Sequence, residues 1–178
     1  MEACGGCSTA RDSTSAAVRP FLHRLECASD GSNLEAIEVT ESEAIEVARR
    51  VVACDNGRDL EGYRALLWDD YHAEVNGAEG VTTGDAEAEA LASYWRAFSD
   101  GYATEEQVVA SGNVVTMRYR LVGTNDGEMD GRPATGRKIE VAGCTIFEIE
   151  DGRVRRVFRY LDVFSWLSQL GMLPGDAA

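Results

Sequence analysis

The most regular pattern of hydrophobic and polar positions lies in the second half of the chain, over residues 114–162. Val115 and Met117 share one parity there, whereas Arg118 and Arg120 take the other. Alternation with a period of two is typical of strands that bury one face and expose the other. The pattern therefore predicts that this half of the chain is built from strands.

The same alternation continues in residues 138–150, where Ile139 and Phe147 lie on the opposite parity from Lys138. The dipeptide Asp151-Gly152 follows this run, and Asp-Gly readily adopts the positive φ values of a tight hairpin turn. We therefore predict an antiparallel meander whose last strand ends at Asp162.

Helical periodicity dominates the region before the meander. Thr40 and Glu43 form a capping-box pattern, in which each side chain satisfies a backbone amide at the start of a helix. An apolar stripe with helical spacing follows, and Asp55-Asn56-Gly57 ends it. The pattern predicts a first helix between these signals and a second, short helix over about 59–67.

The remaining elements follow from shorter signals: a strand near 71–76, a third helix over about 85–98, a strand near 104–111, and a short helix after Asp162 that Gly171 terminates. Helices segregated in this way from an antiparallel sheet indicate an α+β architecture. A curved antiparallel sheet wrapped around the N-terminal helices would leave a cone with an open mouth.

Charge narrows the classes of partner. The chain of 178 residues carries a formal net charge of −14, and Lys138 is its only lysine. Such an acidic surface argues against nucleic acid or an anionic membrane as a partner, because both require a basic footprint. We find no apolar run long enough to span a membrane and no secretory signal pattern, so we expect a cytoplasmic protein. The odd number of cysteines, 5, also fits a reducing compartment.

Residues 1–32 are rich in small and polar side chains and show no sustained periodicity, which predicts a flexible extension in front of a domain spanning 33–178. A competing interpretation is a zinc site, because four residues of the extension have metal-ligand spacing: Cys4, Cys7, His23 and Cys27. The alternative is a chance pattern in an unstructured tail.

Several short segments resemble a known family. They are Gly123-Thr124, Gly127-Glu128-Met129, Pro133-Ala134-Thr135-Gly136-Arg137, Ile146-Phe147, Glu150-Asp151-Gly152-Arg153 and Asp162 followed by Gln169-Leu170-Gly171. In these segments the chain resembles the SnoaL-like polyketide cyclases of the NTF2-like superfamily. The resemblance is dense over residues 114–174, weaker before them, and does not reach the N-terminal extension. It implies the cone fold and a homodimer formed through the open face of the sheet.

Asp162 is the first candidate for chemistry. By strand parity it lies with Phe158 and Tyr160, so we expect it to point into the apolar interior, where burial raises the pKa of a carboxyl group. The resemblance implies that it is the general acid/base of an intramolecular aldol ring closure. The alternative is structural, because Asp162 directly precedes an apolar helical segment and has the position of an N-cap.

His72 is the second catalytic candidate, as a general base or as a hydrogen-bond donor to a substrate carbonyl. Its alternative is an ordinary surface histidine. Two positions depart from the family pattern: Asn125 stands where many members have histidine, and Arg159 where many have a second acidic residue. Candidates for binding a substrate are Tyr71, Trp95, Tyr119, Asn125, Met129, Phe158 and Tyr160. For the aromatic residues and Met129 the alternative is simple core packing.

These features together predict a cyclase-type enzyme that acts by acid/base catalysis on a small hydrophobic carbonyl compound. We find no motif for a phosphate, dinucleotide or catalytic metal, and we expect no cofactor. Two alternatives share the same fold: a protein that binds a hydrophobic ligand without turning it over, and a dimeric structural module whose cone is filled by its own side chains.

Overall fold

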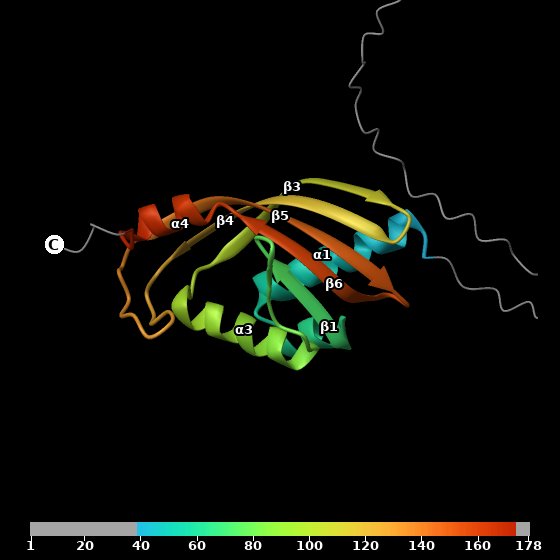
Figure 1. Cartoon of the computed structure of the whole chain (residues 1–178), viewed down its shortest axis with the longest axis horizontal. Helices are drawn as coiled ribbons and strands as arrows, with labels where there is room; N and C mark the ends of the chain where they lie inside the picture. Colours follow the sequence, from blue (N-terminus) through green and yellow to red (C-terminus); the bar gives the residue numbers. More distant parts are fainter. Residues whose placement is uncertain (1–38, 174–178) are drawn as a thin grey trace, which may run out of the picture. The chain divides into compact units, whose positions relative to one another are not determined.

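Six strands form one curved sheet, in the order β2-β1-β6-β5-β4-β3, in the computed structural model, which describes residues 39–173. The strands are β1 (Leu67–Val75), β2 (Ala78–Glu79), β3 (Tyr102–Ser111), β4 (Val114–Thr124), β5 (Lys138–Glu150) and β6 (Arg153–Leu161). The helices are α1 (Glu41–Gly57), α2 (Leu60–Ala65), α3 (Gly84–Ala97) and α4 (Val163–Leu170). Figure 1 shows α1 and α3 on one side of the curved sheet and α4 at the far end of β6. The α+β class is confirmed.

The predicted meander is also confirmed. Strands β3 to β6 pair antiparallel in sequence order, and β6 then runs parallel to β1. Along β5 the residues facing the helices alternate with more exposed ones, from Ile139 at 2% exposed to Ile149 at 1%. The period of two in the sequence therefore identified the buried face of this strand correctly.

The start of α1 follows the predicted capping box. The Glu43 backbone N–H donates to Thr40 Oγ1 at 3.2 Å, and the Thr40 backbone N–H donates to Glu43 Oε2 at 2.9 Å. The helix ends at Gly57, as the Asp-Asn-Gly signal predicts. Its C-cap is Arg58, which has the left-handed backbone conformation that glycine usually takes.

Two details of the N-terminal half differ from the prediction. The second helix ends at Ala65, and β1 begins directly afterwards at Leu67, earlier than the expected start near 71. The short strand β2 was not predicted. It follows a hairpin turn at Asn76-Gly77, where both residues have positive φ, and Asn-Gly is a typical sequence for such a turn.

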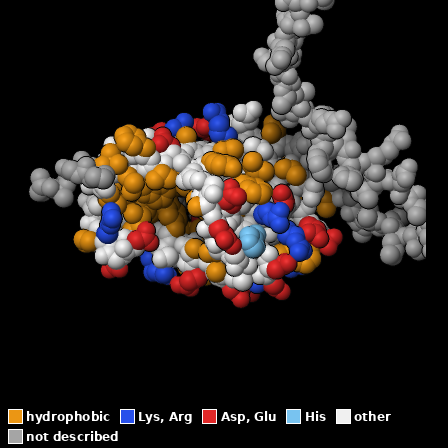
Figure 2. Space-filling model, viewed as in Figure 1, with side chains coloured by type: hydrophobic (Ala, Val, Ile, Leu, Met, Phe, Trp, Pro, Cys, Tyr) orange, Lys and Arg blue, Asp and Glu red, His pale blue; other side chains and the backbone are white. Residues whose placement is uncertain are grey.

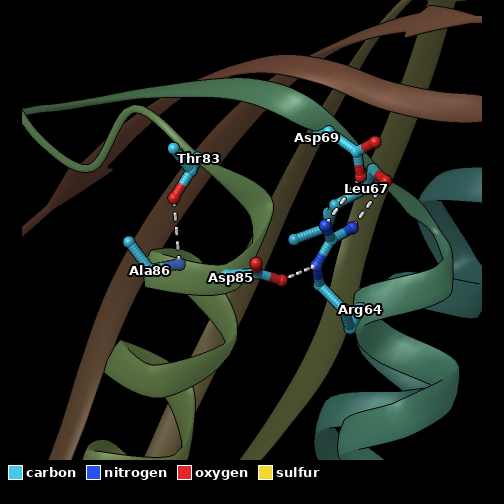
Figure 3. A network of polar contacts seen from close by, with 6 residues as sticks. All are labelled: Arg64, Leu67, Asp69, Thr83, Asp85 and Ala86. Atoms are coloured by element: carbon cyan, nitrogen blue, oxygen red, sulfur yellow. Dashed lines mark hydrogen bonds and ion pairs between the residues drawn. The ribbon is translucent and has the colours of Figure 1, made fainter.

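A charged side chain joins α2, β1 and the start of α3 (Figure 3). Arg64 donates to Asp69 at 2.7 Å and to Asp85 at 2.5 Å, and its Nη1 donates to the Leu67 carbonyl oxygen at 3.2 Å. Gly84 lets the first turn of α3 approach this group, because a methyl group at that position would lie 2.6 Å from a backbone oxygen of β1. The contact fixes the direction in which α3 crosses the sheet.

A β-bulge in β6 changes which side chains face the helices. Glu148 pairs with Arg156 and Ile149 pairs with Val154, so Arg155 is an extra residue on β6. The buried positions are consequently Val154 and Val157, three residues apart rather than two. Beyond the bulge the side chains of Val157 and Arg159 face the helices, and the side chain of Phe158 faces the other side of the sheet.

The expectation that Asp162 points into the interior is therefore wrong. The bulge turns Phe158 and Tyr160 to the outer side of β6, Asp162 shares their parity, and its side chain is exposed. Asp162 is the N-cap of α4: its Oδ1 accepts the Ser165 backbone N–H at 3.0 Å and its Oδ2 accepts the Ser165 hydroxyl at 2.6 Å. These hydrogen bonds hold the pKa of Asp162 below its ordinary value.

Apolar packing is divided between the two ends of the space under the sheet. The larger cluster joins α1 and α2 to β1 and the first half of β4, with Leu67 and Val115 almost fully buried. A smaller cluster around Phe98 and Leu170 packs beneath α4. A third small cluster of Ala103, Leu121 and Val141 packs against Trp166, and a cavity remains among the three clusters.

We predict that Asp162→Ala lowers the melting temperature by a few degrees near neutral pH, because α4 loses its cap. A lowered carboxyl pKa stabilises the folded state above the ordinary carboxyl pKa of about 4, and this contribution disappears as pH falls through the folded-state pKa. The difference in melting temperature from the parent protein should therefore shrink in acid. Thermal unfolding followed by circular dichroism measures both effects. A difference in melting temperature that is the same at all pH values would contradict the claim that the ionised form of Asp162 stabilises the cap.

Candidate active site

The cavity lies between α1, α3 and the inner face of the sheet and has a volume of about 230 Å³. Its walls are mainly apolar, with Val51 from α1, Leu91 from α3, and Met117 and Phe147 from the sheet. Trp166 of α4 closes part of one end. Figure 2 shows hydrophobic side chains gathered around a hollow at the end of the molecule where α4 lies.

Polar side chains enter this cavity from three helices, α1, α2 and α3, and from three strands, β4, β5 and β6. They are Asp55, Tyr63, Glu87, Tyr94, Tyr119, Thr145 and Arg159. A mostly apolar pocket with a few converging polar groups is the usual form of a small-molecule site. The arrangement therefore marks the cavity as the candidate active site.

A buried ion pair crosses the cavity wall between β6 and α3. Arg159 Nη2 donates to Glu87 Oε1 at 2.8 Å, and the side chains are 27% and 6% exposed. The Tyr63 hydroxyl donates to the same Glu87 oxygen at 3.0 Å, and the Tyr71 hydroxyl contacts both members of the pair. Burial is the largest single influence and opposes charge on the guanidinium, but Glu87 together with Tyr63 and Tyr71 outweighs it, so the pKa of Arg159 lies well above its ordinary value.

Asp55 is the titratable carboxyl group of the cavity that burial perturbs most clearly. It comes from the last turn of α1, and its Oδ1 accepts the indole N–H of Trp95 at 2.7 Å. Loss of hydration raises its pKa above the ordinary value, and the Trp95 hydrogen bond with the charges of Arg58 and Arg159 offsets only part of this. A carboxyl group with a raised pKa is suited to proton transfer near neutral pH.

Two phenols face the same space. Burial raises the pKa of Tyr94 and of Tyr119, so both hydroxyls stay protonated and can donate hydrogen bonds. Their environments differ, because Tyr119 is hydrogen-bonded to Thr145, whereas the Tyr94 hydroxyl is buried with no partner among the described residues.

The structure brings one of the sequence-predicted candidates into the cavity wall, namely Tyr119. Trp95 lies directly behind the wall, where it holds Asp55, and Tyr71 is buried behind the Glu87–Arg159 pair. Met129 packs against the apolar cluster beneath α4. These residues support the site without lining it.

Four other candidates lie away from the cavity. The side chain of His72 is 49% exposed, and its Nε2 is 3.8 Å from Glu79. Phe158 and Tyr160 lie on the opposite parity from Arg159 because of the bulge, and Tyr160 is largely exposed. Asp162 caps α4 in solvent. Both sequence-predicted catalytic candidates, Asp162 and His72, therefore lie outside the cavity.

Asn125 is fully buried, but it serves the backbone rather than a ligand. Its Nδ2 donates to the carbonyl oxygens of Ala97 and Gly127, and its Oδ1 accepts the N–H and the hydroxyl of Thr135. All of its hydrogen-bonding capacity is thereby used. The residue fixes the loop between β4 and β5 against the end of α3.

Sequence reasoning missed six of the seven polar residues that line the cavity, and three of the six are charged. Asp55 belongs to the signal that ends a helix, and Glu87 is an acidic residue in a first helical turn, where acidic residues are common. Each therefore had a structural interpretation, and neither was named as a site candidate. Arg159 attracted notice only as a departure from the family pattern, because strand alternation without the bulge places it on the outer face. The helical stripe of α3 could have found Glu87, because it lies four residues before the buried-face residue Leu91.

Within residues 39–173 no group of three or more histidine, cysteine, aspartate or glutamate side chains is placed to hold a metal ion. The predicted alternative of a zinc site at Cys4, Cys7, His23 and Cys27, and the extension over 1–32, lie outside the described residues. In the described part of the chain, no helix is long and apolar enough to cross a bilayer.

A curved sheet that holds a small apolar cavity against three helices, with ionisable groups inside it, defines an NTF2-like small-molecule domain. The profile of the SnoaL-like polyketide cyclases matches residues 45–170, and the chain belongs to this family. None of the curated proteins matches the chain in sequence.

Solved structures agree on the fold. TsrD from Streptomyces laurentii superposes with a TM-score of 0.68 at 23% identity, covering 76% of this chain and 100% of TsrD. AclR from Streptomyces galilaeus has a TM-score of 0.68 at 21% identity, covering 76% of this chain and 100% of AclR. IdmH from Streptomyces antibioticus has a TM-score of 0.63 at 24% identity, covering 72% of this chain and 98% of IdmH. At these identities the likeness establishes the fold, and the chemistry must be argued from the side chains.

We predict that Glu87→Ala destabilises the protein by about 3–5 kcal/mol, because it leaves the Arg159 guanidinium buried without its partner. Urea unfolding followed by fluorescence measures this change. Adding Arg159→Met to the same protein should recover a substantial part of the loss, since no unpaired charge remains. Glu89→Ala, on the exposed face of the same helix, is the matched control. A loss as small as that of the control would contradict the role assigned to the pair.

Proposed function

We propose that this protein is a cofactor-independent acid/base enzyme that closes a ring in a small hydrophobic carbonyl compound by intramolecular aldol addition. The observation that carries the proposal is a carboxyl group, Asp55, whose pKa is raised by burial inside a largely apolar cavity. Membership of a cyclase family supports the reaction class. The cavity volume of about 230 Å³ favours a compact substrate over a large polycyclic one.

Asp55 acts first as a base. Its carboxylate removes a proton from the carbon next to one carbonyl group, which leaves an enolate. The enolate carbon attacks the carbon of a second carbonyl in the same molecule, a C–C bond forms, and the second oxygen becomes an alkoxide. The alkoxide then takes the proton held by Asp55. The product is an isomer of the substrate, so no oxidant, reductant or co-reactant is needed.

Trp95 orients the base. Its indole N–H is committed to Asp55 Oδ1, and this leaves Oδ2 for the substrate. The hydrogen bond also keeps the raised pKa of Asp55 from rising further, because it favours the ionised form. A base in a fixed orientation inside a dry cavity loses little to solvent reorganisation when the proton moves.

Arg159 supplies positive charge to the developing enolate. Its guanidinium is held by Glu87 through one nitrogen, and a quarter of its side-chain surface remains exposed at the cavity. Glu87 fixes the position of the group, so the charge is pre-organised where the substrate lies. Electrostatic stabilisation of this kind is commonly the largest contribution to catalysis.

We predict that Asp55→Asn reduces turnover of a linear diketone, spaced to close a six-membered ring, by at least about a hundredfold. The amide can keep the Trp95 hydrogen bond but cannot accept the substrate proton. Chromatography of the diketone and of its ring-closed isomer measures the rate. Asp162→Asn is the sharpest comparison, since it tests the carboxyl group that the sequence favoured. Loss of turnover in the Asp162 variant with activity kept in the Asp55 variant would refute the proposal.

Stability gives an independent check of the same group. A carboxyl pKa raised by folding means that the native state holds its proton more tightly than the unfolded state, so stability falls as pH rises from about 4 through the folded-state pKa. We therefore predict that Asp55→Asn raises the melting temperature at neutral pH, and that the gain shrinks below pH of about 4. A variant that is less stable than the parent at neutral pH would show that burial of the ionised Asp55 carboxylate does not destabilise the folded state.

We infer further that the protein forms a homodimer. Support comes from three exposed apolar side chains where β6 ends and α4 begins: Tyr160 at 45% exposed, Val163 at 44% and Phe164 at 69%. The family resemblance points to the open face of the sheet as the contact. Light scattering coupled to gel filtration determines the mass in solution, and a monomer at all concentrations would exclude the dimer.

A further inference from the structure

Two buried polar atoms near the active site have no hydrogen-bond partner among the described residues. They are the hydroxyl oxygen of Tyr94 and Nη1 of Arg58. An unpaired buried donor costs free energy, and native structures rarely retain one without a reason. Both atoms belong to groups that act electrostatically on Asp55 or line the cavity beside it.

Arg58 is held firmly in place. Its Nη2 donates to the carbonyl oxygens of Phe98, Ser99 and Gly101 at 3.0, 3.0 and 3.1 Å. Its guanidinium lies 5.3 Å from the centroid of the Trp95 ring, the same ring that orients Asp55. The residue adopts a left-handed backbone with φ of 58°, which a side chain other than glycine seldom does. This backbone conformation ends α1, and the side chain of its C-cap residue is thereby directed to the loop that follows α3.

Tyr94 approaches the same loop from the cavity side. Its ring is stacked on Phe98 with centroids 5.1 Å apart, and it also packs against Trp166. A methyl group at Gly101 would lie 2.9 Å from the Tyr94 hydroxyl, so this hydroxyl and the Arg58 guanidinium both lie against Gly101. Asp55 is the charged group that acts most strongly on Tyr94, which puts the phenol close to the proposed base.

The other phenols of the cavity differ in this respect. Tyr63 donates to Glu87 at 3.0 Å, and Tyr119 is hydrogen-bonded to Thr145. Their hydroxyls are committed to the protein. Tyr94 is therefore the cavity-lining phenol whose buried hydroxyl has no partner among the described residues, and the ring contacts with Phe98 and Trp166 fix the direction of that hydroxyl.

We propose that Tyr94 and Arg58 form an oxygen-binding subsite for the second carbonyl group of the substrate. The Tyr94 hydroxyl donates a hydrogen bond to this oxygen as it becomes an alkoxide, and the positive charge of Arg58 behind it stabilises the same charge. This inference rests on the proposed function and extends it: the substrate is a compact dicarbonyl compound, with one oxygen near Arg159 and the other near Tyr94. Tyr94 donates a hydrogen bond only, and the proton that neutralises the alkoxide comes from Asp55.

A phenolate tests the subsite directly, because it carries a localised negative oxygen on a small flat ring. We choose para-nitrophenol, whose ionised form is yellow and whose binding can be followed by absorbance. Asp55→Asn serves as the reference protein, since the neutral amide mimics the carboxyl group after it has taken the proton. In that protein the probe should bind as its phenolate.

Adding Tyr94→Phe to the reference protein should weaken phenolate binding by at least about fivefold, because a hydrogen bond to a charged group is lost. Any smaller change would overturn the subsite. Tyr102→Phe, which removes a hydroxyl from an exposed ring on β3, is the matched control and should leave binding unchanged. Phenylalanine keeps the ring contacts with Phe98 and Trp166, so the variant should melt within a few degrees of its reference.

Arg58→Lys provides a second test. Lysine keeps the positive charge, but its ammonium group cannot bind the three carbonyl oxygens and also offer a further N–H, as the guanidinium does. We expect weaker phenolate binding here too, and binding equal to that of the reference would remove Arg58 from the subsite. Failure of the reference protein to bind the probe at all would overturn the subsite as a whole. The role of Asp55 as the base is judged separately, by the turnover of the diketone.

Discussion

The buried contact between Glu87 and Arg159 is the constraint on which the site depends. It joins the first turn of α3 to β6, and hence one wall of the cavity to the other. Two ions placed in an apolar space lose hydration that their mutual attraction only partly returns, so such a pair persists only with further hydrogen bonds. Tyr63 and Tyr71 supply these bonds from α2 and β1. The pair thus keeps the cavity open and polar at one end where packed apolar side chains would have closed it.

The bulge at Arg155 is what brings Arg159 to this position. Without the extra residue, the side of β6 that faces the helices would continue from Val154 to Phe158 and Tyr160, and two aromatic rings would fill the space. With it, Val157 and Arg159 face inward. Bulges are common next to active sites, where they redirect a side chain and bend the strand locally. One inserted residue therefore separates a filled cone from one that holds a charged cavity.

The bulge at Arg155 also explains how far the sequence could predict the structure. Local signals identified the capping box at Thr40, the strand parity of β5 and the position of Asp162 before α4, because each depends on neighbours a few residues away. The family and the α+β cone followed from several such signals together. Residues that form the site meet across distant elements, as Asp55 and Trp95 do over 40 positions, and no local pattern reports such a contact. Asp162 was misplaced because parity was carried across a bulge that alternation cannot reveal.

The balance of charge in the cavity favours a neutral carbonyl substrate over a carboxylate. Arg159 lines the cavity with the two carboxyl groups Glu87 and Asp55, and Arg58 acts on Asp55 from outside the lining, so the charges balance while Asp55 is ionised. A substrate anion would have to approach that carboxylate and would be repelled. Once Asp55 has taken a proton, the same groups carry a net positive charge, and at that moment the substrate has become an enolate. The site therefore interacts more strongly with the charged intermediate than with the substrate, which is the condition for catalysis rather than for simple binding.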